Sequence, residues 1–496
     1  MNTPEWVKDT IFYQIFPDRF ARSERMPDIG FEAWDSPPTT YGFKGGDLYG
    51  VTEKLDYLKD LGITAIYLNP IFSSASNHRY HTFDYYNVDP LQGGNDAFRL
   101  LLDQAHKRKI RIVLDGVFNH ASRGFWQFHH VLENGEGSPY KDWFLFDPDR
   151  LSKKRHWGAY PGKEEQKALQ HGEDSLTAIG YRAWWHLPAL PKLNTNHPAV
   201  REFIFGVAEY WLKFGIDGWL LDVPAEIDDD SFWREFRQRV RAVNPEAYIV
   251  GEIWLEAQRW LQGDQFDATM NYLLTAGLLG FCGGSHLRMD EVKRVGGYHG
   301  RVHPKMNAEG FSQHIEYMLG LYPSDINQVQ FNLLDSHDTP RFLTCVGNDK
   351  NALKLAWQFL FTFPGAPCIY YGDEIGIDGS HDPDCRKSFQ WDESKWDNDL
   401  RDYLKKLIVL RKAHPALRTG EYKKLYAEDG VVVYERTDSR EKLLVAINAS
   451  ESTRHVEVWG EAGRKPQIIF GQASDISSKD GRIQFTISAR SGILIK

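Results

Sequence analysis

Acidic and imidazole side chains follow several short apolar runs in this 496-residue chain. An aspartate follows GWLL, a glutamate follows YIVG, and a His-Asp pair follows VQFNLLDS. The full set is His120, Asp222, Glu252, His337 and Asp338. A single aspartate at the end of a strand is more often a structural hydrogen-bonding group. Several carboxyl groups gathered at one place are costly unless they serve a purpose.

Cleavage of a glycosidic bond needs two carboxyl groups in opposite protonation states. One must be ionised to attack or stabilise the anomeric carbon, and the other must hold a proton for the leaving oxygen. Burial and mutual repulsion separate two pKa values in this way. The chain also has 16 tryptophans and an aromatic fraction of 14%. Ring faces of this kind stack on sugars, although large cores use them too.

The segments that must position these residues alternate between apolar runs and amphipathic stretches. The runs are unbroken and rich in β-branched and aromatic residues, which is typical of strands covered on both faces. About eight such units favour a closed (β/α)8 TIM barrel, an α/β fold, over an open doubly wound sheet. The sixth strand is placed near 265–272, and Thr52 and Ser231 are predicted helix caps. Because barrel enzymes carry their active groups at the carboxyl ends of the strands, the five residues should share one rim.

Two regions interrupt this alternation. Residues 121–196 are long, aromatic and irregular, and they form a predicted inserted domain after the third strand. The barrel then comprises residues 1–120 and 197–417. From residue 418 to 496 short alternating strands predict a C-terminal all-β domain of the sandwich type.

The composition excludes several partners. The net charge is −9, and the sequence has no basic patch for nucleic acid or an anionic membrane. No apolar run is long enough to span a bilayer, and the N-terminus lacks the features of a signal peptide. The four cysteines are scattered and are expected to be free thiols. These features predict a cytoplasmic protein.

Four segments resemble the ordered signature regions of the α-amylase superfamily, glycoside hydrolase family 13. They are DGVFNH (115–120), GWLLDVPAE (218–226), VGEIW (250–254) and LLDSHD (333–338). LPKLN (190–194) is similar to the fifth region in the neopullulanase and cyclomaltodextrinase subgroup. NHRYHTFDYY (77–86) and DPDCRKSFQWD (382–392) are similar to substrate-binding loops of that subgroup.

The resemblance implies a role for each matching residue. Asp222 matches the nucleophile, Glu252 the general acid and then base, and Asp338 the third carboxylate, which holds sugar hydroxyls. The implied mechanism is double displacement with retention. The implied substrate-binding residues are Tyr80, His120, Trp254, His337, Asp382 and Arg386. The expected substrates are maltodextrins, cyclodextrins and pullulan.

Leu220 departs from the pattern, because the family carries arginine two residues before the nucleophile. Side chains alternate along a strand, so residues 220 and 222 face the same way. An arginine there would lower the pKa of Asp222, whereas leucine offers only desolvation. The sequence therefore supports two hypotheses. The protein is either an active α-glucan hydrolase or transferase, or a catalytically weakened or silent glucan-binding relative. A dinucleotide enzyme is disfavoured, since no GxGxxG motif follows the first strand.

Other expectations concern domains, metals and rings. The subgroup's N-terminal β-domain is expected to be missing, because Ile11 already begins the first barrel strand. No cofactor is required. The resemblance allows calcium without indicating it, since the loop at 21–30 has few oxygen ligands and Asn119 reads first as a hydrogen-bonding residue. Trp184 and Trp185 either line the cleft or fill the core. The oligomeric state is undecided.

Overall fold

The computed structural model describes residues 3–152, 160–460 and 466–496. Within these ranges eight parallel strands form one sheet in the order β8-β7-β6-β5-β2-β1-β10-β9. An isolated parallel bridge between Met270 and Phe331 joins the two ends of the sheet and closes the barrel. The strands are β1 (Phe12–Ile15), β2 (Ala65–Leu68), β5 (Arg111–Gly116), β6 (Gly218–Leu221), β7 (Tyr248–Gly251), β8 (Ala268–Thr269), β9 (Phe331–Asn332) and β10 (Ala366–Tyr370). The predicted TIM barrel is confirmed, and its sixth strand lies within 265–272.

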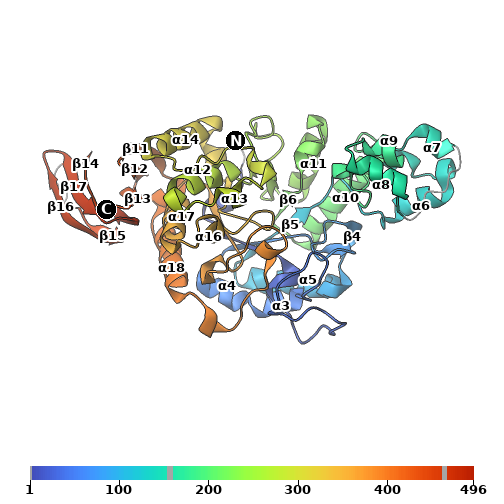
Figure 1. The fold of residues 1–496 in the computed structure, drawn as a ribbon, viewed down its shortest axis with the longest axis horizontal. Helices are drawn as coiled ribbons and strands as arrows, with labels where there is room; N and C mark the ends of the chain where they lie inside the picture. Colours follow the sequence, from blue (N-terminus) through green and yellow to red (C-terminus); the bar gives the residue numbers. More distant parts are fainter. Residues whose placement is uncertain (1–2, 153–159, 461–465) are drawn as a thin grey trace.

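Helices surround this barrel and cover the apolar outer face of the strands (Figure 1). In α5 the buried residues Ala97, Phe98, Leu101, Leu102 and Ala105 share one side of the helix, as an amphipathic helix requires. The longer helices are α5 (Gly94–Lys107), α10 (Pro198–Phe214), α11 (Asp230–Val243), α12 (Tyr272–Gly283), α14 (Ala308–Leu321), α17 (Lys350–Thr362) and α18 (Asn398–Ala413).

Two predicted helix caps are wrong. The stretch around Thr52 is split into α3 (Leu48–Glu53) and α4 (Leu55–Leu61), and Asp47 caps α3 by accepting from the Gly50 amide. Asp229 caps α11, because its carboxylate accepts from the amides of Ser231 and Phe232. Ser231 instead lies inside the first turn of α11.

The segment between β5 and α10 forms a separate unit of short helices. They are α6 (Trp126–Asn134), α7 (Pro148–Ser152), α8 (Lys163–Gln170) and α9 (Ser175–Ile179). Aromatic rings fill its interior, with Phe128 packed edge-to-face on Phe144 and Tyr181. An antiparallel bridge between His120 and Lys192 ties the unit to the barrel rim. In Figure 1 it lies at one end of the molecule.

The C-terminal strands lie at the opposite end and form two sheets (Figure 1). A five-stranded sheet has the order β11-β12-β13-β18-β15, and a three-stranded sheet has the order β14-β17-β16. Val433 and Ile493 of the first sheet share an apolar core with Val456 and Phe485 of the second. The strands are β11 (Glu421–Glu428), β12 (Val431–Thr437), β13 (Lys442–Asn448), β14 (Arg454–Trp459), β15 (Ile468–Phe470), β16 (Ala473–Lys479), β17 (Arg482–Ile487) and β18 (Ser491–Ile495). The all-β prediction is confirmed.

The register of the barrel strands sets the height of each inward side chain. Asp115 of β5 is level with Leu220 of β6, and Leu220 is level with Val250 of β7. Asp222 and Glu252 therefore project one layer nearer the carboxyl end of the barrel. Among the described residues, no helix is long and apolar enough to cross a membrane.

Candidate active site

Asp222 and Glu252 lie immediately beyond two neighbouring strands, β6 and β7. The ladder continues past the ends of both strands, since the Asp222 amide donates to Gly116 O at 3.1 Å and the Glu252 amide to Leu221 O at 3.0 Å. The backbone thus fixes both residues side by side at the rim. The structure brings these two predicted residues together.

Two N–H groups hold the Glu252 carboxylate. The Val223 amide donates to Oε2 at 3.1 Å, and the Trp254 indole donates to Oε1 at 3.0 Å. Val223 makes its contact from a left-handed backbone with φ of 37°, which is rare for a β-branched residue. Burial and then the nearby Asp338 charge raise the pKa of Glu252 to about 8, against the lowering effect of both donors. This shift favours the protonated form of Glu252 near neutral pH.

Asp222 has fewer partners than its neighbour. The residue is 9% exposed, and its Oδ2 atom is buried with no hydrogen-bond partner among the described residues. Burial first, and then repulsion from Glu252, Asp115 and Asp338, raises the pKa of Asp222 well above its ordinary value. Asp222 Oδ2 is thus a buried carboxyl oxygen whose hydrogen-bonding capacity no described side chain uses.

Asp338 is anchored by a cation and an imidazole. Arg386 Nη2 lies 3.4 Å from Asp338 Oδ1, and His337 Nε2 lies 3.2 Å from Asp338 Oδ2. Arg386 also pairs with Asp382 at 3.1 Å and donates through Nε to His337 O at 2.8 Å. The four predicted residues from 337 to 386 form one connected group.

Tyr80 links that group to a buried carboxyl of β5. Its hydroxyl donates to Asp115 Oδ2 at 2.8 Å and lies 2.8 Å from His337 Nε2, and its ring stacks on the imidazole at 5.4 Å and 5°. Gln14 Nε2 and Asn69 Nδ2 approach Nδ1 of His337 at 3.0 and 3.1 Å. Because amide nitrogens only donate, Nδ1 accepts and the imidazole proton sits on Nε2. His337 thereby points its N–H at Asp338 and Tyr80.

His120 is completely buried, and its ring stacks on Trp184 at 4.9 Å and 10°. Its Nε2 atom is buried and has no hydrogen-bond partner within the limits of 3.5 Å and ordinary geometry among the described residues. Burial lowers the pKa of His120 to about 3 and that of His337 to about 4. Both imidazoles are neutral at neutral pH and act as hydrogen-bonding groups.

Trp254 is placed beside Glu252, but its ring is covered. Tyr272 stacks on the indole at 3.7 Å and 3°, and Gly297 lies so close to the ring that it leaves no room for a β-carbon. The indole N–H to Glu252 is the polar contact it makes. Stacking of Trp254 on a sugar stays a prediction.

Asp115 belongs to the site and was missed as a functional residue. Its side chain is 2% exposed, accepts from the Tyr67 hydroxyl at 2.5 Å as well as from Tyr80, and leaves Oδ1 buried without a partner among the described residues. Burial, with a smaller contribution from Asp338, raises the pKa of Asp115 to about 7. The available signal was its inward position on β5, at the level of Leu220.

These residues do not resemble a metal centre. Among the described residues, no group of three or more His, Cys, Asp or Glu side chains could hold a metal ion. Asn119 Oδ1 is a buried oxygen without a partner there, but no carboxylate cluster accompanies it. The donor set therefore does not fit a calcium ion built on acidic side chains.

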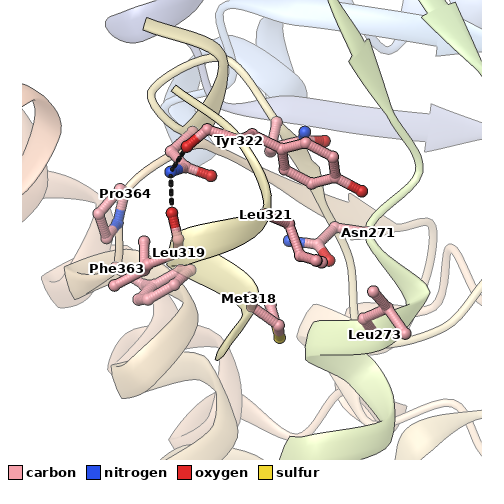
Figure 2. A pocket seen from close by; sticks show the side chains of 10 residues that line it. Asn271, Leu273, Met318, Leu319, Leu321, Tyr322, Phe363 and Pro364 are labelled. Atoms are coloured by element: carbon pink, nitrogen blue, oxygen red, sulfur yellow. Dashed lines mark hydrogen bonds between the residues drawn. The ribbon is translucent and has the colours of Figure 1, made fainter. Parts of the chain in front are cut away.

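A small pocket near the starts of β9 and β10 is separate from this site. Figure 2 shows Met318, Leu319, Leu321 and Phe363 among its lining residues. Asn327 closes it by donating to the carbonyls of Leu319 and Tyr322. None of the predicted site residues lines this pocket.

Comparison with known proteins places the chain in a family. The alpha amylase catalytic domain matches residues 14–420, and the alpha-amylase C-terminal domain matches residues 420–494. The chain is 44% identical over 460 residues to cyclomaltodextrinase from Geobacillus thermopakistaniensis, covering 92% of this chain and 71% of that protein. It is 40% identical over 501 residues to neopullulanase 2 from Thermoactinomyces vulgaris, covering 100% and 78%. The solved structure of the native Nostoc punctiforme debranching enzyme matches with a TM-score of 0.88 and 45% identity, covering 100% of this chain and 99% of that chain. The chain belongs to the α-amylase family of glycoside hydrolases.

Proposed function

We propose that this glycoside hydrolase cleaves α-1,4-glucosidic bonds of maltodextrins, cyclodextrins and pullulan with retention of the anomeric configuration. Its relatives named cyclomaltodextrinase and neopullulanase support this substrate class. Transfer of the glucosyl group to a sugar acceptor, in place of water, is a variant of the same chemistry.

The observation that carries the proposal is the hydrogen bond from the Val223 amide to Glu252 Oε2. Val223 directly follows Asp222, so this contact keeps the two carboxyl groups on the same side of the rim. A retaining glycosidase needs such a pair on opposite sides of one glycosidic bond. The raised pKa of Glu252, about 8, supplies the protonated partner.

Asp222 is the proposed nucleophile and Glu252 the proposed acid and base. A carboxylate oxygen of Asp222 bonds to the anomeric carbon while the glycosidic bond breaks, and Glu252 gives its proton to the departing oxygen. Water then attacks the anomeric carbon of the glucosyl ester, Glu252 takes the proton from that water, and Asp222 leaves as a carboxylate.

The remaining residues are proposed to hold the glucosyl unit. Asp338 and the N–H of His337 bind its hydroxyl groups, His120 offers Nε2 from the other side, and Tyr80 stacks on its ring. The contact of Arg386 with both Asp338 and Asp382 supports its proposed place at the non-reducing side. For Trp254 the indole bond to Glu252 supports a positioning role.

A product analysis tests the proposal. The protein is incubated with maltotriose, starch, pullulan and β-cyclodextrin, and the products are separated by chromatography, with the first anomer identified by NMR. We expect α-anomers first; panose from pullulan would indicate a neopullulanase, and ring opening a cyclomaltodextrinase. The inactive controls are Asp222→Asn and Glu252→Gln. First-formed β-anomers would refute retention.

A second candidate is a catalytically weakened or silent glucan-binding relative. Leu220 favours it, because it supplies no cation, and Asp115 Oδ1 and Asp222 Oδ2 are buried without a hydrogen-bond partner among the described residues. Binding of maltoheptaose without cleavage of any substrate would select this candidate. A cytoplasmic location stays part of the proposal, and the four buried free cysteines are compatible with it.

A further inference from the structure

Three aromatic rings form a column that leads outward from the barrel rim. His120 stacks on Trp184 at 4.9 Å and 10°, and Trp184 stacks on Trp185 at 4.5 Å and 12°. His120 is completely buried, whereas Trp185 is 73% exposed. The outer face of the last ring is therefore presented to solvent.

A short hairpin of the inserted unit holds this column in place. The Trp184 amide donates to Leu190 O at 3.0 Å, and Ala183 and Pro191 form an antiparallel bridge. The residue after Pro191, Lys192, forms an antiparallel bridge with His120 itself. The tip of the hairpin is thus fixed relative to the candidate active site.

The backbone at the tip is strained. Trp185 has φ of 50° and the following His186 has φ of 57°, in the left-handed region that bulky residues avoid. Strain of this kind persists only where the surrounding structure imposes it, and it concentrates at ligand-binding sites. An exposed indole on a strained backbone adds no buried apolar surface to the core. This combination favours a role for Trp185 in binding a ligand.

The other aromatic rings of the site have less surface to offer. Tyr272 and Gly297 cover Trp254, and Tyr80 stacks on His337. Trp184 is enclosed between His120 and Trp185. Trp185 is therefore the ring of this group with a free face.

We infer that Trp185 is a stacking platform for a glucosyl unit of the substrate, beyond the unit held around Asp222. The inference rests on the proposed function, because continuity with His120 identifies the ligand as an α-linked glucan. The apolar C–H face of glucose packs on an indole, and such a contact needs no charge. Substrates long enough to reach the tip of the hairpin gain binding energy from this stacking contact, and short substrates do not.

The test measures kcat/KM for maltotriose through maltoheptaose. Trp185→Gly removes the ring and also suits the left-handed backbone, so its melting temperature should equal or exceed that of the wild type. We expect kcat/KM to fall about tenfold for maltoheptaose and less than twofold for maltotriose, with Trp185→Phe in between. Trp126→Ala is the matched control, because Trp126 lies on α6 of the same inserted unit and is 58% exposed.

A binding measurement separates this inference from the proposed function. In Glu252→Gln, maltoheptaose should quench tryptophan fluorescence, and the added Trp185→Gly change should abolish that quenching. If the wild type cleaves no glucan, the proposed function fails, while this titration still shows whether maltoheptaose binds at Trp185. Equal losses for every chain length would overturn the inference, as would a dimer that dissociates when Trp185 is replaced.

Discussion

Replacement of Leu220 by arginine tests how the site balances its charges. Leu220 is 2% exposed and lies level with Asp115, whose pKa is raised to about 7. An aspartate in an unfolded chain titrates near 3.9. Because the folded state binds this proton more tightly, Asp115 destabilises the fold progressively as the pH rises from about 4 to about 7, and the loss is complete above that range.

The size of the effect follows from the pKa difference. About 3 pH units correspond to about 4 kcal/mol at most, at about 1.4 kcal/mol each. A guanidinium at position 220 would pair with Asp115 and favour ionised Asp222, while the longer side chain costs about 1–3 kcal/mol of overpacking. The free energy of unfolding of the arginine variant should therefore show a net gain at pH 8 and no gain at pH 5.

The assay compares Leu220→Arg with Leu220→Met, which keeps the volume without adding charge. We expect the melting temperature of the arginine variant to rise relative to the methionine variant between pH 5 and pH 8. We also expect kcat/KM on maltodextrins at pH 8 to be about tenfold higher, which corresponds to about 1.4 kcal/mol of transition-state stabilisation. Parallel melting curves at both pH values, with no gain in activity, would refute the idea that leucine is a handicap.

Three further predictions concern other contacts. Trp254→Phe removes the indole N–H that donates to Glu252. Because that donor favours the ionised form, its loss raises the pKa of Glu252, and the alkaline limb of the pH–kcat/KM profile should move to higher pH. The maximum of the profile should be about tenfold lower. Tyr80→Phe removes one donor to buried Asp115, so calorimetry should record a loss of about 1–3 kcal/mol. Arg436→Met leaves the carbonyls of Thr362, Leu417 and Gly420 without their buried donor, and thermal melting should show a loss of about 3 kcal/mol. The exposed Arg440→Met is its control, and equal losses in both variants would contradict the role of Arg436.

The barrel could be predicted because its strands are buried on both faces and read as continuous apolar runs. GWLL and YIVG became β6 and β7 without a break. The seventh strand was harder, since only Phe331 and Asn332 of the run 329–335 pair in the sheet. After Asn332 the chain leaves the ladder to present His337 and Asp338, and an apolar run does not reveal where its hydrogen bonding stops.

Caps and contacts between distant residues could not be read in the same way. Asp229 and Ser231 are equally good capping types, and only the helix start decides which side chain reaches the free amides. The covering of Trp254 depends on Gly297, more than forty residues away. Local patterns therefore placed the site residues on the rim, while the packing of each ring required the folded chain.

The carboxyl groups around the proposed catalytic pair share a single problem of charge. Asp115, Asp222 and Glu252 lie together, whereas Arg386 serves Asp338 and Asp382 instead. Because no cation among the described residues pairs with Asp115, Asp222 or Glu252, bound protons are what limits their negative charge. Asp222 works only when it is ionised, and each proton held by the other two lowers the repulsion that opposes this ionisation. A protonated Asp115 thus does part of what an arginine at position 220 would do, because it removes one of the charges that oppose the ionisation of Asp222.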